Sequence, residues 1–300
     1  MGWKQGLFRM KAIVLALALV PLLEQVAPAG AEDRIAVVAA ENFYGDIVRQ
    51  IGGERVALVS IMNNPDQDPH LFETTPAIVR QLAGARLVVL NGANYDPWMD
   101  KLLAAVPRTD RTVISAAQLT GRKPGDNPHL WYYPATMPAV ATAVAEGLTK
   151  FDAMHASEYA ARLKTTLASL DRISQRVAQL KAKHAGASVT ATEPVFGPMA
   201  QALGLTMRNE RFQLAMMNDT EPSARDVAAF EKDLRERKVK VLIYNSQVSE
   251  KLTERLRDIA GKAKVPVVGV TETMPPNVSF QDWVLGELDA LDKALSGPNS

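Results

Sequence analysis

Cysteine is absent from the 300-residue chain, histidine occurs only four times, and neither sign of charge dominates. Without disulfide bonds, an exported protein must obtain its stability from its core alone. A formal net charge of +1 predicts no basic surface, so we expect no nucleic-acid partner. The sequence also contains no HExxH, GxSxG, P-loop or glycine-rich dinucleotide motif. These absences direct attention to the few histidines and to the carboxylates.

The first 31 residues have the features of a secretory signal peptide. Lys4, Arg9 and Lys11 give a positive start, and Ala12–Leu23 is an apolar run too short to span a bilayer comfortably. Small residues at Ala29-Gly30-Ala31 match a cleavage site. Because no cysteine can carry a lipid there, we expect a free periplasmic protein rather than a lipoprotein. An N-terminal membrane anchor is the alternative.

After the signal peptide, short apolar runs alternate with helical patterns, which predicts two α/β lobes, each a parallel sheet flanked by helices. The first lobe covers residues 32–150 and the second covers residues 187–300. The expected strands are Ile35–Ala40, Val56–Ile61, Leu87–Asn91, Thr112–Ser115, Ser188–Thr192, Val241–Tyr244 and Val265–Val270. The expected helices include Tyr44–Ile51, Ala77–Leu82, Asp226–Arg237, Glu250–Ala263 and Gln281–Leu295.

Residues 151–186 are expected to join the lobes through one long helix. Apolar residues recur every three or four positions between Ser157 and Lys183, and neither proline nor glycine interrupts the run. Such a helix would be about 40 Å long, enough to extend along a two-lobed protein. A coiled coil is the competing interpretation.

Two of the four histidines lie in matching motifs, Asp68-Pro69-His70-Leu71-Phe72 and Asn127-Pro128-His129-Leu130-Trp131. Proline restricts its own backbone and that of the preceding residue, so each motif presents its histidine from a stiff turn. Ligands held in place before an ion arrives make a better metal site. The pair therefore predicts a metal site, with two capping loop histidines as the alternative. His155 and His184, in or beside the long helix, are expected to be solvated.

Two carboxylates of the second lobe are candidates for the remaining ligands. Glu193 follows the strand expected at Ser188–Thr192, and Glu272 follows the one at Val265–Val270. Ligands of open α/β sheets bind beyond the carboxyl ends of the strands. A carboxylate there is costly unless it is paired, solvated or bound to a cation. Solvated loop residues are the alternative, and competing carboxylates are Glu41, Asp66, Asp68 and Glu221.

With these motifs the chain resembles the metal-binding solute-binding proteins of bacterial ABC importers, the zinc/manganese-uptake family (solute-binding family 9). The likeness covers nearly all of the chain after the signal peptide. It includes Glu41-Asn42-Phe43-Tyr44-Gly45-Asp46-Ile47, Asn91-Gly92-Ala93, Thr192-Glu193-Pro194-Val195-Phe196, Thr220-Glu221-Pro222-Ser223 and Gln281-Asp282-Trp283, besides both Pro-His motifs. The resemblance implies two lobes joined by a long backbone helix. It also implies one metal ion between them, with His70, His129, Glu193 and Glu272 as ligands.

The chain departs from the family pattern in three places. Glu272 stands where the family usually has Asp, and Tyr133 stands where it commonly has an Asp that would support the neighbouring histidine. The segment Leu119–Asp126 is short and lacks the histidine-rich loop of many zinc-specific members. Two imidazoles and two carboxylates favour manganese or ferrous iron, although zinc accepts the same ligands.

We therefore expect the substrate-binding component of an ABC importer, a monomer and not an enzyme. Its cargo would be one divalent transition-metal ion (manganese, zinc or iron), delivered to the importer's membrane permease. A mononuclear metal hydrolase is one alternative, but it needs an open coordination position and a general base. A binding protein for an organic solute is another, for which Trp98, Trp131 and Arg211 could line a cleft.

Overall fold

The computed structural model describes residues 1–2, 34–64, 72, 74–248 and 250–297. Residues 3–31 of the predicted signal peptide therefore lie outside the described residues, as do His70, Asp66 and Asp68. Within the described ranges, no helix is both long and apolar enough to cross a membrane. The folded body begins at Arg34.

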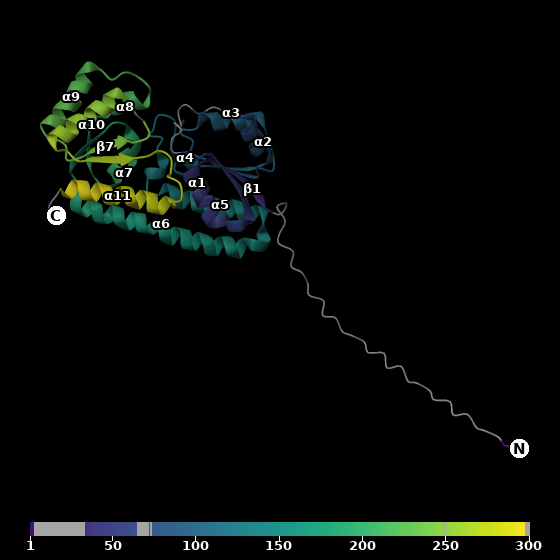
Figure 1. Cartoon of the computed structure of the whole chain (residues 1–300). Helices are drawn as coiled ribbons and strands as arrows, with labels where there is room; N and C mark the ends of the chain where they lie inside the picture. Colours follow the sequence, from purple (N-terminus) through teal and green to yellow (C-terminus); the bar gives the residue numbers. More distant parts are fainter. Residues whose placement is uncertain (3–33, 65–71, 73, 249, 298–300) are drawn as a thin grey trace. The chain divides into compact units, whose positions relative to one another are not determined.

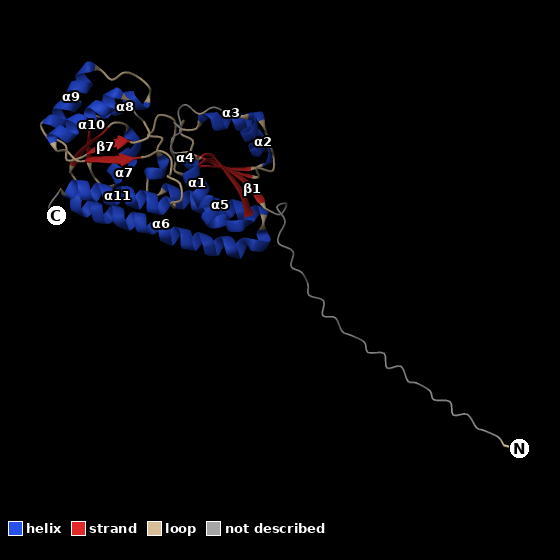
Figure 2. Cartoon of the chain, viewed as in Figure 1, coloured by secondary structure: helices blue, strands red, loops and turns tan. Residues whose placement is uncertain are grey.

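From residue 34 onwards the described chain forms two α/β lobes, each built on a four-stranded sheet (Figures 1 and 2). The strands of the first are β1 (Ile35–Glu41), β2 (Val56–Met62), β3 (Leu87–Leu90) and β4 (Thr112–Ser115). Those of the second are β5 (Ser188–Ala191), β6 (Thr206–Arg208), β7 (Leu242–Asn245) and β8 (Val267–Val270). Every pairing is parallel, in the orders β2-β1-β3-β4 and β6-β5-β7-β8. The predicted pair of parallel sheets is confirmed, and the sequence missed only the short strand β6.

The helices of the first lobe are α1 (Asn42–Gly52), α2 (Pro76–Gly84), α3 (Pro97–Ala105), α4 (Ala116–Leu119) and α5 (Thr136–Phe151). Those of the second are α7 (Gly197–Ala202), α8 (Glu210–Met217), α9 (Ala224–Arg235), α10 (Lys251–Ala263) and α11 (Phe280–Ser296). Ser223 and Ser279 cap α9 and α11 with their side-chain oxygens. In the segment Thr220-Glu221-Pro222-Ser223 the chain becomes helical only after Ser223.

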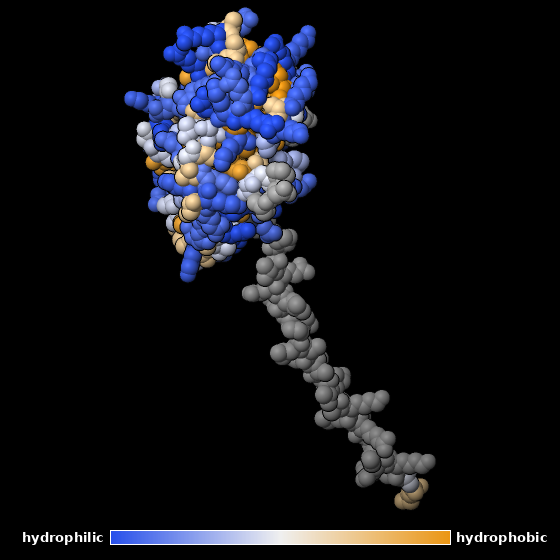
Figure 3. Space-filling view, turned by 90° about the vertical axis from the view of Figure 1, so that its left-hand side faces the viewer, coloured by the Kyte–Doolittle hydropathy of each residue, from blue (hydrophilic) through white to orange (hydrophobic). Residues whose placement is uncertain are grey.

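Both faces of the central strands are buried, which is why these strands read as unbroken apolar runs. In β1, Val37 and Ala39 belong to a core beneath α1 and α5, while Val38 and Ala40 pack against α2 and α3. The first of these cores continues into the second lobe beneath α6, α7 and α11. The two lobes thus share one apolar core. On the outside, the face seen in Figure 3 is mostly hydrophilic, with scattered apolar residues.

The long helix α6 (Ala156–His184) runs beneath both lobes, with α11 beside it (Figure 1). Its buried residues include Leu170, Ile173, Val177 and Leu180, so the predicted helix and its apolar stripe are confirmed. The prediction of a solvated His184 is wrong. This side chain is buried, and its Nε2 lies 2.7 Å from Asp292 Oδ1 of α11. His155 is half-buried, and its Nδ1 lies 2.8 Å from Asp152.

Candidate metal centre

Three polar residues lie side by side at the carboxyl edge of the second sheet. Glu193 follows β5, Asn245 ends β7, and Glu272 follows β8, and these three strands are neighbours in the sheet. In open α/β sheets, ligands bind between two neighbouring strands whose following connections run to opposite sides of the sheet. In the second sheet this position lies between β5, which is followed by β6, and β7, which is followed by β8. The strand order thus brings together the two carboxylates that the sequence predicts separately.

The two carboxylates share one amide donor. Asn245 Nδ2 donates to Glu193 Oε2 at 3.1 Å and to Glu272 Oε1 at 2.7 Å. Glu193 is 8% exposed and Glu272 is 1% exposed. Gln247 steadies the segment after β8, because its Oε1 accepts from the backbone N–H groups of Glu272 and Thr273. Two buried acids joined by a neutral amide create a site that favours a cation.

His129 is held by its own loop. Asn127 Oδ1 accepts from the backbone N–H of His129 at 3.0 Å and lies 2.8 Å from the ring Nδ1. The carbonyl of Pro128 accepts from Asn91 Nδ2 at 2.9 Å, which ties the Pro-His turn to the end of β3. Residues 127 and 91 therefore position the imidazole before any ion arrives.

The hydrogen bonds of Asn127 also decide which nitrogen of His129 carries the proton. Asn127 Nδ2 donates to the carbonyl of Pro194 at 2.8 Å, so its Oδ1 is the atom that faces the imidazole. An amide oxygen only accepts, and Nδ1 must then carry the hydrogen. The lone pair of the neutral ring is consequently on Nε2, the usual arrangement for a metal-binding histidine.

The lone pair of His129 points at the opposite lobe. His129 Nε2 lies 3.5 Å from Glu272 Oε2, and this nitrogen, buried in a side chain 1% exposed, makes no hydrogen bond. Tyr95 O–H, also from the first lobe, donates to Glu272 Oε2 at 3.2 Å. An imidazole lone pair and a carboxylate oxygen repel each other unless a proton or a metal ion lies between them.

The structure describes three of the four predicted ligands, His129, Glu193 and Glu272. Within the ranges the structure describes, no group of three or more His, Cys, Asp or Glu side chains could hold a metal ion. His70 lies outside those ranges. The structure brings His129 and Glu272 face to face and connects Glu193 to Glu272 through Asn245.

A second buried acid pair lies in the first lobe, at the ends of β1 and β3. Glu41 is 1% exposed, and burial followed by the charge of Asp96 raises the pKa of its carboxyl well above the usual range. Asp96 accepts the backbone N–H groups of Asn91 and Gly92 at 2.8 and 2.7 Å. Burial raises the pKa of Asp96 to about 6, with those hydrogen bonds opposing the shift. Both carboxyl oxygens of Glu41 are buried without a hydrogen-bond partner. Glu221, another competing candidate, is exposed.

The sequence did not identify Asn127, Asn245 or Tyr95 as residues of the site. A signal for Asn127 was present in the polar-Pro-His pattern, since a side chain two positions before a histidine can reach its Nδ1. Tyr133 stands where the family commonly has a supporting Asp, and its ring lies 4.0 Å from the guanidinium of Arg122. The support for His129 comes instead from Asn127.

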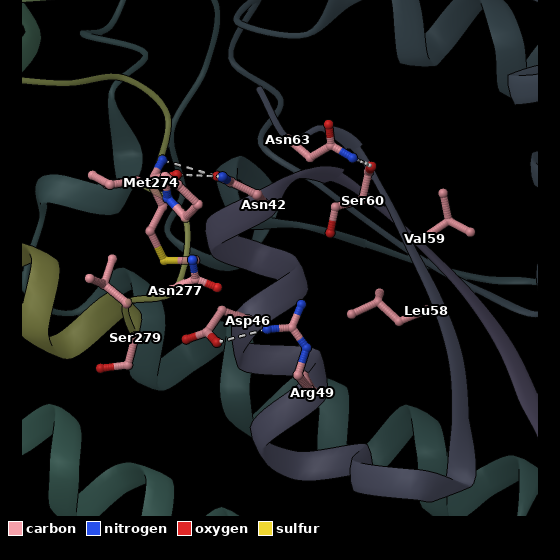
Figure 4. Close-up of a pocket in the computed structure, with 13 residues that line it drawn as sticks. Asn42, Asp46, Arg49, Leu58, Val59, Ser60, Asn63, Met274, Asn277 and Ser279 are labelled. Atoms are coloured by element: carbon pink, nitrogen blue, oxygen red, sulfur yellow. Dashed lines mark hydrogen bonds and ion pairs between the residues drawn. The ribbon is translucent and has the colours of Figure 1, made fainter. Parts of the chain in front are cut away.

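The segment after Glu272 is attached to the first lobe. Asn42 Nδ2 donates to the carbonyl of Met274 at 2.7 Å, and Asn42 Oδ1 accepts from its N–H at 3.1 Å. A cavity between α1, β2 and residues 274–279 lies beside this pair, and Figure 4 shows it with Asp46 and Arg49 on its α1 wall. Asn42 thus bridges the lobes instead of capping α1.

The geometry defines a two-lobed α/β binding protein with a cation-favouring site of nitrogen and oxygen donors. The chain belongs to the family described as zinc-uptake complex component A, periplasmic, whose model matches residues 37–294.

Similar proteins have been named for different metals. The manganese ABC transporter substrate-binding lipoprotein PsaA of Streptococcus anginosus is 23% identical, over 93% of this chain and 95% of its own length. The iron-binding protein YfeA of Yersinia pestis is 22% identical, over 78% of this chain and 76% of its own length. The periplasmic zinc binding protein TroA from Treponema pallidum has the same fold, with a TM-score of 0.73 and 22% identity. The match covers 87% of this chain and 99% of TroA.

One expectation about location is corrected by these relatives. PsaA and the manganese-binding MntA of Bacillus subtilis are named as lipoproteins. This finding overturns the expectation of a free periplasmic protein without a lipid anchor. That expectation rested on the absence of cysteine from the printed sequence, which does not establish how the protein is held in the envelope. The family description and the name of TroA support a periplasmic or other extracytoplasmic location.

Proposed function

We propose that this protein captures one divalent transition-metal ion between its lobes and delivers it to the permease of an ABC importer. The proposed ligands are His70 and His129 from the first lobe and Glu193 and Glu272 from the second. The observation that carries the proposal is the approach of His129 Nε2 to Glu272 Oε2 at 3.5 Å, in a buried position. A metal ion between these two atoms would remove their repulsion and complete a shell from both lobes.

The proposed shell has two nitrogen and two oxygen donors, which favours manganese or ferrous iron over zinc. Relatives named for manganese, iron and zinc support a transition metal as the cargo. Binding requires neutral imidazoles and ionised carboxylates, so affinity is expected to fall as the solution is acidified.

We further propose that the protein is a monomer without enzymatic activity. Its two lobes would cover residues 32–150 and 187–300, joined by the helix of residues 151–186. Four protein ligands leave tetrahedral zinc no position for a catalytic water. For an organic solute, the sequence offered Trp98, Trp131 and Arg211. Trp131 is buried in the core against Phe43, and Trp98 packs on Phe72, so neither favours that alternative.

Elemental analysis of the purified protein tests the proposal. After expression with competing manganese, zinc and iron, we expect one tightly bound equivalent of metal per chain. His129→Ala should lose that equivalent. The matched control is His155→Ala, which replaces a histidine beside the long helix and should keep the metal. Glu193→Gln should also release the metal, because it removes a negative charge without changing the size of the side chain. Retention of the metal in both His129→Ala and Glu193→Gln would refute the proposed site.

A further inference from the structure

Glu287 is a buried carboxyl group on α11 that contacts both segments carrying described candidate ligands. Its Oε2 lies 2.8 Å from the phenol oxygen of Tyr132, three residues after His129. Its Oε1 accepts from the backbone N–H of Thr271, the residue before Glu272, at 3.2 Å. The indole N–H of Trp283 donates to the same oxygen at 3.0 Å. One side chain thus joins the two lobes directly behind the candidate metal centre.

The hydrogens of this cluster can be counted. The phenol of Tyr132 has one hydrogen, yet its oxygen lies within hydrogen-bond distance of two acceptors, Glu287 Oε2 at 2.8 Å and the carbonyl of Thr271 at 2.9 Å. If Glu287 were ionised, Tyr132 could satisfy only one of them fully. If Glu287 is protonated, its own O–H donates to the Tyr132 oxygen, and Tyr132 donates to Thr271. Every short contact then has a donor and an acceptor.

We infer that Glu287 is a neutral carboxylic acid that positions the His129 loop and the Glu272 segment relative to each other, through the chain Glu287 O–H, Tyr132 O–H and the Thr271 carbonyl. Its role in metal binding rests on the proposed function, whereas its protonation does not. Glu287 is a positioning residue and touches none of the described ligand side chains.

The surroundings agree with a neutral acid. Glu287 is 8% exposed, and burial raises its pKa to about 8, although its contacts with Tyr132, Thr271 and Trp283 oppose the shift. The ionisable groups facing α11 from neighbouring helices have other partners. Asp46 of α1 accepts from the N–H of Phe280 and from Gln50. From α6, a cluster of bases pairs with acids further along α11: Arg176 with Asp289 and Asp292, and Lys183 and His184 with Asp292. Glu272, next to Thr271, is the other buried acid of this segment.

Two variants at this position separate the neutral acid from its charged form. Glu287→Gln keeps the acceptor for Thr271 and Trp283 and replaces the acid O–H with an amide donor. Glu287→Leu removes both functions at similar volume. Should the leucine variant fail to fold, Tyr132→Phe interrupts the same chain at its middle member.

The first measurement is urea unfolding of metal-free protein from pH 5 to pH 9. Because the pKa of Glu287 is raised on folding, its stabilising contribution is complete below the ordinary Glu pKa and is lost as the pH rises to about 8. The stability of Glu287→Gln relative to the native protein should therefore increase from pH 5 to about pH 8 and then level off. A relative stability that stays constant across this range would overturn the inference.

The second measurement is manganese affinity by calorimetry at pH 7. We expect Glu287→Gln to bind within about threefold of the native protein, and Glu287→Leu or Tyr132→Phe to bind at least about tenfold more weakly, the size typical of lost outer support at metal sites. Equal weakening in Glu287→Gln and Glu287→Leu would overturn the positioning role. If the native protein binds no metal, the proposed function fails, while the unfolding series still decides whether Glu287 is neutral.

Discussion

Each lobe buries two carboxyl groups beyond the strands of its sheet, but the two lobes hold them in different ways. In the first lobe, Asp96 accepts two backbone N–H groups of its own loop, and burial followed by the charge of Asp96 raises the pKa of Glu41 well above its usual range. In the second lobe, Glu193 and Glu272 share the amide of Asn245, and Glu272 faces an imidazole of the other lobe. In the first pair the loop satisfies Asp96, whereas both oxygens of Glu41 are buried without a hydrogen-bond partner. In the second pair the arrangement favours a cation.

This difference teaches that a buried carboxylate after a strand does not by itself identify a metal ligand. Glu41 and Glu272 are equally buried, Glu41 as the last residue of β1 and Glu272 two residues beyond β8. What separates them is the group in front of the carboxyl: another acid for Glu41 and a histidine lone pair for Glu272. An acid facing an acid retains a proton, whereas an acid facing a neutral imidazole can bind a metal.

The largest effect is expected for a substitution of Glu272, which is compared with the same substitution of Glu41. Glu272→Gln should weaken manganese binding by at least about 100-fold, or about 2.7 kcal/mol, because it removes a charged ligand. Glu41→Gln should leave the affinity within about threefold, since a neutral acid is replaced by a neutral amide of similar size. Isothermal titration calorimetry on both variants measures this. If Glu41→Gln loses as much affinity as Glu272→Gln, the distinction between the lobes is wrong.

Next in size is a substitution between the second-lobe carboxylates. Asn245→Asp puts a third acid where an amide now donates to both. We expect a loss of about 2–3 kcal/mol in the free energy of unfolding of the metal-free protein. Excess manganese should restore part of it by mass action. Urea unfolding with and without metal measures both. The control is Asn277→Asp at an exposed position, and a cost no larger than that control would contradict the prediction.

A smaller effect is expected where the first lobe orients its histidine. Asn127→Ala removes the acceptor for His129 Nδ1, so the imidazole is no longer held in one orientation and one tautomer. Loss of such outer support typically costs 10–100-fold in metal affinity, and we expect about 10-fold here. Calorimetry against the exposed control Asn218→Ala checks this. An unchanged affinity would mean that the His129 loop is rigid without the amide.

The smallest effect is expected away from both acid pairs, in the contact between α6 and α11. His184, followed by Lys183 and Arg176, holds the pKa of Asp292 well below its usual range. The stabilisation that ionised Asp292 contributes to the fold is thus present above the ordinary Asp pKa and is lost as the pH falls below about 4. Asp292→Asn should cost about 1 kcal/mol at pH 7 and leave metal affinity unchanged. Thermal unfolding at pH 7 and pH 3 measures it, with the more exposed Asp289→Asn as the control.

Much of the fold was predictable because its signals are local. Apolar runs marked seven of the eight described strands, and the stripe of α6 marked the longest helix. Strand β6 was missed because Thr206–Arg208 is short and only partly buried, so it has no apolar run. The burial of His184 was missed because it depends on Asp292, which is 108 positions away in the sequence.

The sequence by itself determined the two sheets, the long helix and the stiff Pro128-His129 turn, because strand and helix periodicity and proline geometry act over a few residues. Only the tertiary structure decided which acids have raised pKa values, which nitrogen of His129 faces the other lobe, and that Glu287 joins Tyr132 to Thr271. Those features depend on contacts between residues that are far apart in the chain, such as the 155 positions between Tyr132 and Glu287. Burial then sets their protonation, since the loss of water makes each charge depend on the group that faces it.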